Sequence, residues 1–172
     1  MAEPSGNMRI LGSLREENGA GVVRVEDVYD TNIEDLWSAI TEPARLARWV
    51  VTVDGDLRVG GEFSATFTSG WEGVGRVDVC DAPHHLRVTT WSDDDAPGVI
   101  EATLVEEGAG TRLVIEENGL PLDVYFHHGS GWQTHIEDLA SYLAGRERSD
   151  WGVRARELSP AYREMAAGLS AH

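Results

Sequence analysis

Two short helix patterns joined at a proline, followed by several strand patterns and one longer helix pattern, constrain the fold more than any other feature. The first short pattern has Leu36, Trp37 and Ile40 on its apolar side, and the second starts at Pro43, a residue suited to the first turn of a helix. Helices this short are not stable alone, so both must pack on an apolar surface. The longer pattern begins near Trp132. This order predicts a curved sheet that packs around the long helix and leaves a cavity between them.

Alternation of apolar and polar residues predicts an antiparallel meander of about seven strands. The first two strands form a hairpin around the turn-rich segment Glu17–Gly21. Glycines inside the later patterns, such as Gly73 and Gly75, predict bulges that let the sheet curl. The strand patterns lie at Ile10–Glu16, Val22–Tyr29, Phe63–Phe67, Val77–Val79, Leu86–Trp91, Ile100–Leu104 and Leu113–Ile115.

The longer helix pattern covers Ser130–Ala144. Trp132, Ile136 and Leu139 recur at helical spacing and form one apolar face. Gly145 suits the end of such a helix. We therefore expect this helix to lie in the concave side of the sheet.

The chain length of 172 residues suits one domain with a sizeable core. We expect that domain over residues 10–145, preceded by a flexible leader over residues 1–9. Residues 146–172 read as a C-terminal tail with a short amphipathic helix that begins at Ser159, and this tail either docks on the domain or pairs with a second subunit.

The charge balance excludes two classes of partner. The formal net charge is −16, and a surface of that sign repels the phosphates of nucleic acid and anionic lipid headgroups. No apolar stretch approaches 18 residues, and the first residues do not resemble a signal peptide. We expect a cytoplasmic protein that neither inserts into membranes nor binds nucleic acid.

The residue types also exclude several kinds of chemistry. The sequence has no lysine, which rules out a lysine Schiff base and a P-loop lysine. Cys80 is the single cysteine, so a disulfide framework and a multi-cysteine metal site are excluded. His128 and His135 lie about 10 Å apart along a helix axis, too far to share one ion. We expect no cofactor and no metal.

Seven short motifs, in this order along the chain, carry a family resemblance. The sequence resembles the START-like (birch-pollen-allergen-like, SRPBCC) superfamily, and within it the branch similar to the activator of the heat-shock-protein-90 ATPase. The resemblance implies an α+β helix-grip fold, in which a curved antiparallel sheet wraps a long C-terminal helix and two short helices close one end. The motifs are Leu36–Pro43, Leu46 with Trp49, Asp56–Gly61, Gly75–Val77, Leu86 with Thr90–Trp91, Gly110–Leu113 and Gly131–Trp132.

Members of this superfamily bind varied small molecules, so the leading hypothesis is non-catalytic binding of an apolar or amphipathic ligand in the cavity between sheet and helix. We expect Trp49 between cavity and solvent, with its N–H on a polar partner, and Trp37 in the core. The candidate ligand-binding residues are Trp49, Phe63, Phe67, Trp91, Tyr125, Phe126 and His135.

Two alternative functions stay open. The first is an enzyme of the cyclase or dehydratase kind, with His135 as general acid or base and Tyr125 as an orienting group. The second is a protein-interaction module, either a chaperone cofactor or a subunit of a homodimer, which the acidic surface and the amphipathic tail favour. The eukaryotic chaperone activators carry an additional N-terminal domain, for which this sequence has no room.

Overall fold

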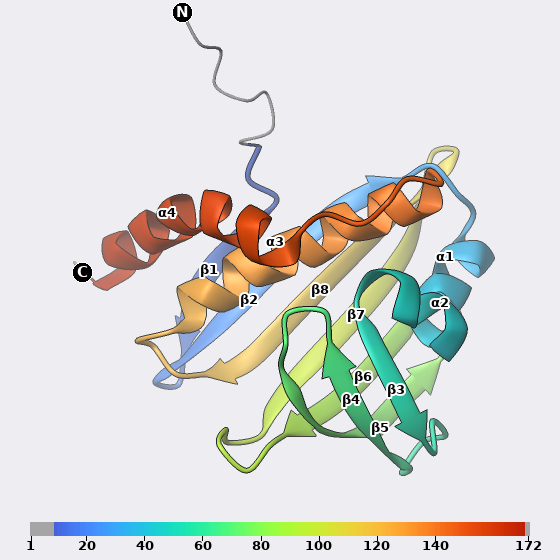
Figure 1. Cartoon of the computed structure of the whole chain (residues 1–172), viewed down its shortest axis with the longest axis horizontal. Helices are drawn as coiled ribbons and strands as arrows, with labels where there is room; N and C mark the ends of the chain where they lie inside the picture. The colour runs from blue at the N-terminus through green and yellow to red at the C-terminus, as the bar shows by residue number, and fades with distance from the viewer. Residues whose placement is uncertain (1–8, 171–172) are drawn as a thin grey trace, which may run out of the picture.

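The structure is a computed structural model that describes residues 9–170, where it contains an eight-stranded antiparallel sheet and four helices (Figure 1). The leader predicted for residues 1–9 lies outside the described residues except for Arg9. The elements are β1 (Gly12–Glu17), β2 (Ala20–Tyr29), α1 (Ile33–Thr41), α2 (Pro43–Trp49), β3 (Val51–Gly55), β4 (Glu62–Phe67), β5 (Glu72–Asp81), β6 (His85–Trp91), β7 (Gly98–Glu107), β8 (Gly110–Leu120), α3 (Tyr125–Leu143) and α4 (Trp151–Ser170).

The strand order is β1-β2-β8-β7-β6-β5-β4-β3, and all neighbours are antiparallel. This confirms the predicted α+β helix-grip fold and adds one strand to the predicted seven. The additional strand, β3, follows α2 directly and pairs only with β4. It is five residues long, so its alternation rests on Val51 and Val53 alone and was too brief to be recognised from the sequence.

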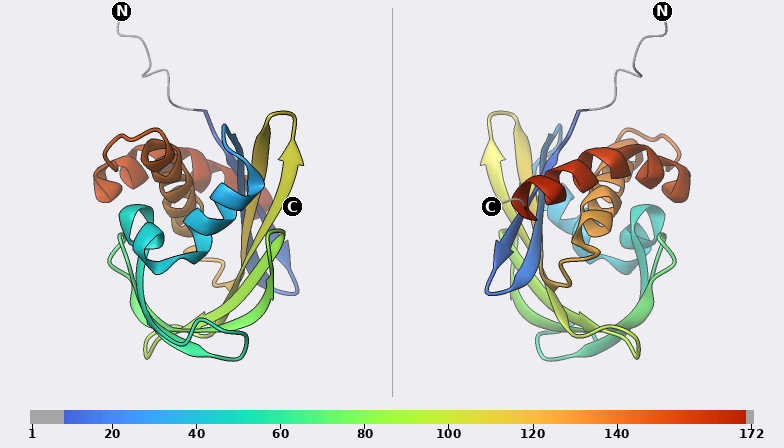
Figure 2. Two further views of the ribbon diagram at one scale, coloured as in Figure 1. Left: turned by 90° about the vertical axis from the view of Figure 1, so that its right-hand side faces the viewer. Right: turned by 90° about the vertical axis from the view of Figure 1, so that its left-hand side faces the viewer.

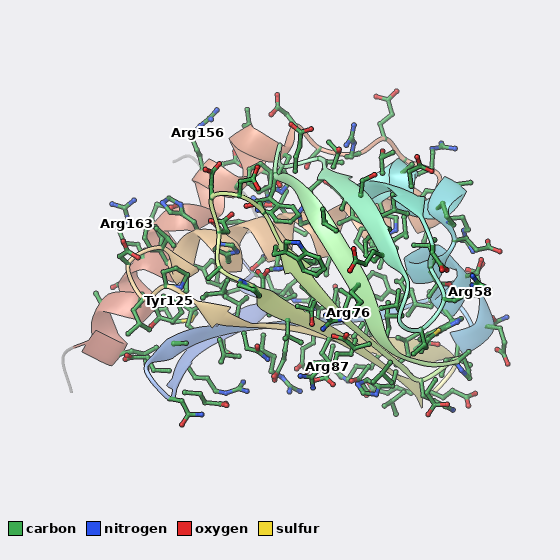
Figure 3. The ribbon with its side chains drawn as sticks, turned by 90° about the horizontal axis from the view of Figure 1, so that it is seen from below. Arg58, Arg76, Arg87, Tyr125, Arg156 and Arg163 are labelled. Carbon is green, nitrogen blue, oxygen red and sulfur yellow. The ribbon has the colours of Figure 1, made fainter. Side chains whose placement is uncertain are left out.

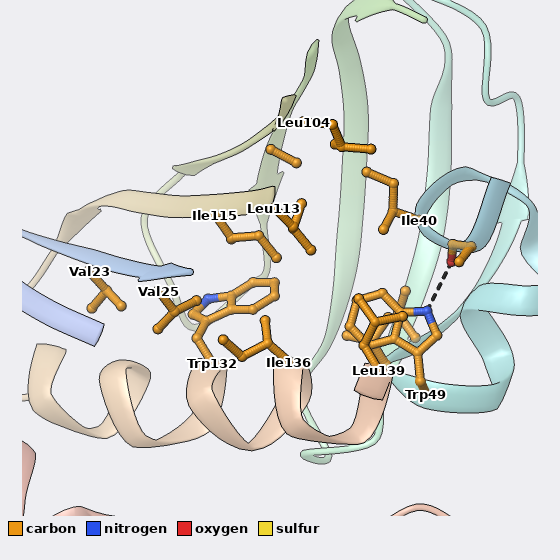
Figure 4. Packing of buried hydrophobic residues seen from close by; sticks show 14 of the residues in the cluster. Val23, Val25, Ile40, Trp49, Leu104, Leu113, Ile115, Trp132, Ile136 and Leu139 are labelled. Atoms are coloured by element: carbon orange, nitrogen blue, oxygen red, sulfur yellow. Dashed lines mark hydrogen bonds between the residues drawn. The ribbon is translucent and has the colours of Figure 1, made fainter. Parts of the chain in front are cut away.

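The sheet bends into a trough, and α3 lies along its concave side (Figure 2). Trp132, Ile136 and Leu139 point from α3 toward the sheet, where they meet Leu113 and Ile115 (Figure 4). The helix begins at Tyr125, five residues before the predicted start. Helices α1 and α2 close one end of the trough, as the resemblance implied.

The C-terminal helix α4 is much longer than the short segment expected from Ser159. It packs on α3 and β1, and Leu158 and Tyr162 are fully buried there. Ala155, Leu158 and Tyr162 are spaced as one helical stripe, which charged neighbours such as Arg154 obscure in the sequence. The helix of the tail is therefore longer than predicted, with 20 residues, and it docks on the body of the protein.

Across residues 9–170, none of the helices is both long enough and apolar enough to cross a lipid bilayer.

Candidate functional site

An apolar chamber lies between the concave sheet, α2 and α3. Its cavity volume is about 160 Å³. No charged residue is among its lining residues, and the indole N–H groups of Trp49 and Trp132 are already bonded to the protein, so the chamber offers few hydrogen bonds beyond two threonine hydroxyls and the thiol of Cys80. Its lining includes Leu46, Trp49, Phe63, Phe67, Leu86 and Trp132.

A polar chamber adjoins the apolar chamber toward the N-terminal half of α3. Its cavity volume is about 250 Å³. Phe67, Thr90, Ile100 and Trp132 line both chambers, so the two spaces meet at these four side chains. The residues that belong to the polar chamber alone include Trp71, Asp95, Glu117, His128, His135 and Trp151.

Four of the predicted ligand-binding residues lie at these chambers. Trp49 and Phe63 line the apolar chamber, Phe67 lines both, and His135 lines the polar chamber. Their role in ligand binding stays a prediction.

The other three predicted residues, Trp91, Tyr125 and Phe126, line neither of these two chambers. Trp91 follows Thr90 on β6, and alternation puts it on the outer side of the sheet with Arg87. Tyr125 is buried against Gly21 of β2, at the α4 end of the molecule (Figure 3).

Phe126 packs outside both chambers, against the imidazole of His127 and the guanidinium of Arg163. Its ring centroid lies 4.0 Å from that of His127, and the guanidinium of Arg163 lies 4.8 Å above it. Phe126 thus fastens α4 to α3. The enzyme alternative requires His135 to open onto a cavity, and His135 lines the polar chamber, whereas Tyr125, its expected orienting group, lines neither chamber.

Trp49 is 2% exposed, so the predicted position between cavity and solvent is wrong. Its Nε1–H donates to the carbonyl oxygen of Ala39 at 2.9 Å, which supplies the polar partner that we expected (Figure 4). This bond ties the indole of α2 to α1, and the ring lines the apolar chamber rather than the protein surface. Trp37, predicted as core, is only partly buried because it lies at the edge of the face that α1 packs inward.

His135 is enclosed by aromatic rings. Its ring centroid lies 5.9 Å from that of Phe67, 5.3 Å from that of Trp132 and 5.8 Å from that of Trp151. Burial, with a smaller contribution from the charge of Arg148, lowers the pKa of His135 from 6.5 to about 3. The imidazole is therefore neutral at physiological pH.

Trp151 brings α4 into the site. A Cβ on Gly131 would lie 2.9 Å from Cζ2 of Trp151, so the glycine leaves the space that the indole fills. Trp151 was not among the predicted site residues, because in the sequence it reads as part of a tail. Trp151 lies four residues before Ala155, the first residue of the buried stripe of α4. This helical spacing could have identified Trp151 as a buried residue.

Glu117 forms hydrogen bonds with two other residues in the wall of the polar chamber. Its Oε1 accepts from Nε1–H of Trp132 at 2.9 Å and lies 2.9 Å from Nδ1 of His128. Burial lowers the pKa of His128, but the hydrogen bond and charge of Glu117, with the charge of Asp95, outweigh it and raise the pKa above its usual value. Glu117 was not among the predicted site residues, although alternation on β8 places it on the inward face with Leu113 and Ile115.

Within the described part of the chain, no three histidine, cysteine or acidic side chains are grouped so that they could hold a metal ion. His128 bonds to Glu117, and His135 sits among rings. Both histidines therefore belong to the wall of the polar chamber.

Known proteins with the same architecture include a family whose model matches this chain and several solved structures. The model of a family described as "Activator of Hsp90 ATPase homolog 1-like protein" matches residues 30–144. The crystal structure of CalU16 from Micromonospora echinospora is 25% identical, covers 90% of this chain and 95% of CalU16, and has a TM-score of 0.76. EF2215 from Enterococcus faecalis, a conserved protein of unknown function, is 21% identical over 92% of this chain and 91% of its own, with a TM-score of 0.72.

A third similar structure, DynU16, is described as a protein in the dynemicin biosynthetic locus. It is 23% identical with a TM-score of 0.67, and the match covers 75% of this chain and 50% of DynU16. Among curated proteins, none matches this sequence. The family match ends before α4, so Trp151 lies outside it.

Proposed function

Since this chain belongs to the family of Activator of Hsp90 ATPase homolog 1-like proteins, a family with a helix-grip fold, we propose that it binds a small apolar or amphipathic molecule inside the trough without converting it. The observation that carries this proposal is the pair of adjoining chambers, one apolar and one edged with hydrogen-bonding groups.

The size of the apolar chamber suits the end of a ligand rather than a whole one. An apolar cavity of about 150 Å³ in an engineered protein stays dry and takes up benzene. The apolar chamber, at about 160 Å³, is similar in size and lining. One aromatic ring or a short branched chain fills it.

The polar chamber suits the other end of the same molecule. It adds about 250 Å³ and contains indole, imidazole and carboxylate groups. Ligand sites are commonly apolar with a few polar groups that fix orientation. A ligand that spans both chambers would place its apolar end near Trp49 and its polar end near His135.

Titration with N-phenyl-1-naphthylamine, an apolar dye that fluoresces when it leaves water, tests the proposal. We expect saturable binding of one dye per chain. Ala102 lines the apolar chamber and is buried, so Ala102→Leu fills the space and weakens binding by about tenfold or more. Ala167 is exposed on α4, so Ala167→Leu adds the same atoms outside the chamber and serves as the matched control.

Unchanged dye affinity in Ala102→Leu, with its fold intact by circular dichroism, would show that the dye does not enter the apolar chamber. Absence of saturable binding to the natural protein would overturn the proposed function.

A further inference from the structure

Unpartnered polar atoms gather at the polar chamber. In residues 9–170, four buried side-chain atoms have no hydrogen-bond partner, and two of them are Nδ1 of His135 and Nε1 of Trp151. Both rings line the polar chamber, with centroids 5.8 Å apart and planes tilted by 32°. Buried polar groups are almost always hydrogen-bonded, so two adjacent exceptions at one cavity wall indicate a partner that enters the cavity.

The other indoles of the same chamber provide an internal comparison. Trp71 donates its Nε1–H to Asp95 at 2.9 Å, and Trp132 donates to Glu117 at 2.9 Å. Of the three tryptophans at this wall, only Trp151 has no acceptor. Two of the three indole N–H groups are therefore paired with carboxylates of the protein, and that of Trp151 is not.

The two unpartnered groups restrict the chemistry of any ligand atom that pairs with both. An indole N–H can only donate, so the ligand atom must accept. The buried His135 is neutral and offers one N–H and one lone pair, so it can pair with either an acceptor or a donor. A carbonyl oxygen accepts from both rings, and a hydroxyl accepts from the indole while it pairs with the imidazole.

Charged ligand groups fit less well. A cation carries no lone pair for the indole of Trp151. A carboxylate would lie in the same chamber as Glu117 and Asp95, and like charges in a buried space repel. An uncharged oxygen has the lone pairs that a cation lacks, and it is not repelled by Glu117 and Asp95 as a carboxylate would be.

We propose that His135 and Trp151 together recognise one uncharged oxygen, a ketone or a hydroxyl, on an otherwise apolar ligand. This inference rests on the proposed function and names the class of ligand that the trough prefers. It also assigns to α4 a part in recognition, because Trp151 comes from that helix and reaches the chamber over the bare α-carbon of Gly131.

Two probes of the same shape test this assignment. 2-Acetylnaphthalene carries a ketone where 2-isopropenylnaphthalene carries a methylene group, and the two molecules are otherwise alike. Their affinities are measured by isothermal titration calorimetry for the natural protein and for each variant. The ratio of the two affinities is then compared between proteins, so that the difference in hydration of the free probes cancels.

We expect the ketone-to-hydrocarbon ratio to fall by about tenfold in Trp151→Phe and in His135→Phe, the cost of one lost hydrogen bond in a closed site. Trp37→Phe removes an indole that lines neither chamber, so this control variant keeps the ratio of the natural protein.

Nuclear magnetic resonance gives a second readout that does not depend on variant folding. The indole N–H signal of Trp151, identified by its loss in Trp151→Phe, is expected to move downfield with the ketone and to stay in place with the hydrocarbon. A ratio that both variants leave unchanged, or a signal that responds equally to both probes, would overturn the assignment while binding itself stands. Absence of binding by either probe would overturn the proposed function and the assignment together.

Discussion

Gly129 lies directly beneath the ring of Tyr162, and a Cβ at position 129 would stand 2.5 Å from Cδ1 of that ring. Tyr162 is fully buried, and its hydroxyl donates to Oε1 of Gln133 at 2.6 Å. The same Oε1 accepts from the backbone N–H of Leu11 at 3.0 Å. The bare α-carbon of Gly129 thus lets α4 approach α3 closely enough to share one hydrogen-bond centre with the segment before β1.

Gly129→Ala should destabilise the protein, because neither the buried ring of Tyr162 nor the helix backbone can move away easily. We expect a loss of about 1–3 kcal/mol in the free energy of unfolding from overpacking, reduced by the better helix propensity of alanine. Urea denaturation measures the difference. Gly152→Ala, where the nearest atom would be 3.5 Å away, is the control and should gain stability by up to about 1 kcal/mol. Equal stability of the two variants would show that α4 does not pack on Gly129 as described.

Trp49→Ala should destabilise the protein more than Trp37→Ala. Trp49 is 2% exposed and bonds to the carbonyl of Ala39, so its removal opens a large cavity and leaves that oxygen without a partner. We expect a loss of about 3–5 kcal/mol for Trp49→Ala and a clearly smaller one for the partly buried Trp37. Chemical denaturation of both variants provides the comparison. The reverse order would mean that the docking of α2 on α1 is wrong.

The burial of His135 should make stability fall as the solution is acidified. The pKa of His135 is 6.5 in its usual state and about 3 in the folded protein, so between these values the unfolded chain binds a proton that the folded chain does not. The stability from neutral His135 is present above pH 6.5 and is lost as pH falls toward 3. From pH 7.5 to pH 5.5 the loss is about 1 kcal/mol.

His135→Phe isolates this contribution, because the other titrating groups are the same in both proteins. Denaturation of the natural protein and the variant at pH 7.5 and pH 5.5 gives the comparison, and both values stay above the isoelectric point of about 4.6. The natural protein should lose more stability than the variant on acidification. An identical loss would place His135 in contact with water.

Glu117→Gln should lower the pKa of His128. The carboxylate of Glu117 bonds to Nδ1 of His128 and raises the pKa of that imidazole, and a neutral amide removes the charge while it keeps the shape. Titration of the histidine ring protons by nuclear magnetic resonance follows the change. Glu116→Gln is the control, because Glu116 pairs with Arg15 and Arg24 and leaves His128 untouched. A pKa of His128 that does not fall in Glu117→Gln would show that the pair is not formed in solution.

The sequence predicted the chain order of helices and most strands, because apolar spacing reports burial on one face of each element. It also led to Trp49, Phe63, Phe67 and His135, which the structure places at the chambers. It misplaced Trp91, although the strict alternation of Leu86, Val88 and Thr90 shows which face of β6 is turned inward.

What only the tertiary structure decided is which separate segments meet. Trp151 reaches His135 because α4 turns back along α3, and Glu117 reaches Trp132 because β8 lies beneath that helix. Local spacing determines which side of an element is buried, but it carries no information on the partner that buries it. The chambers, their unpartnered polar atoms and the part played by α4 follow from that docking alone.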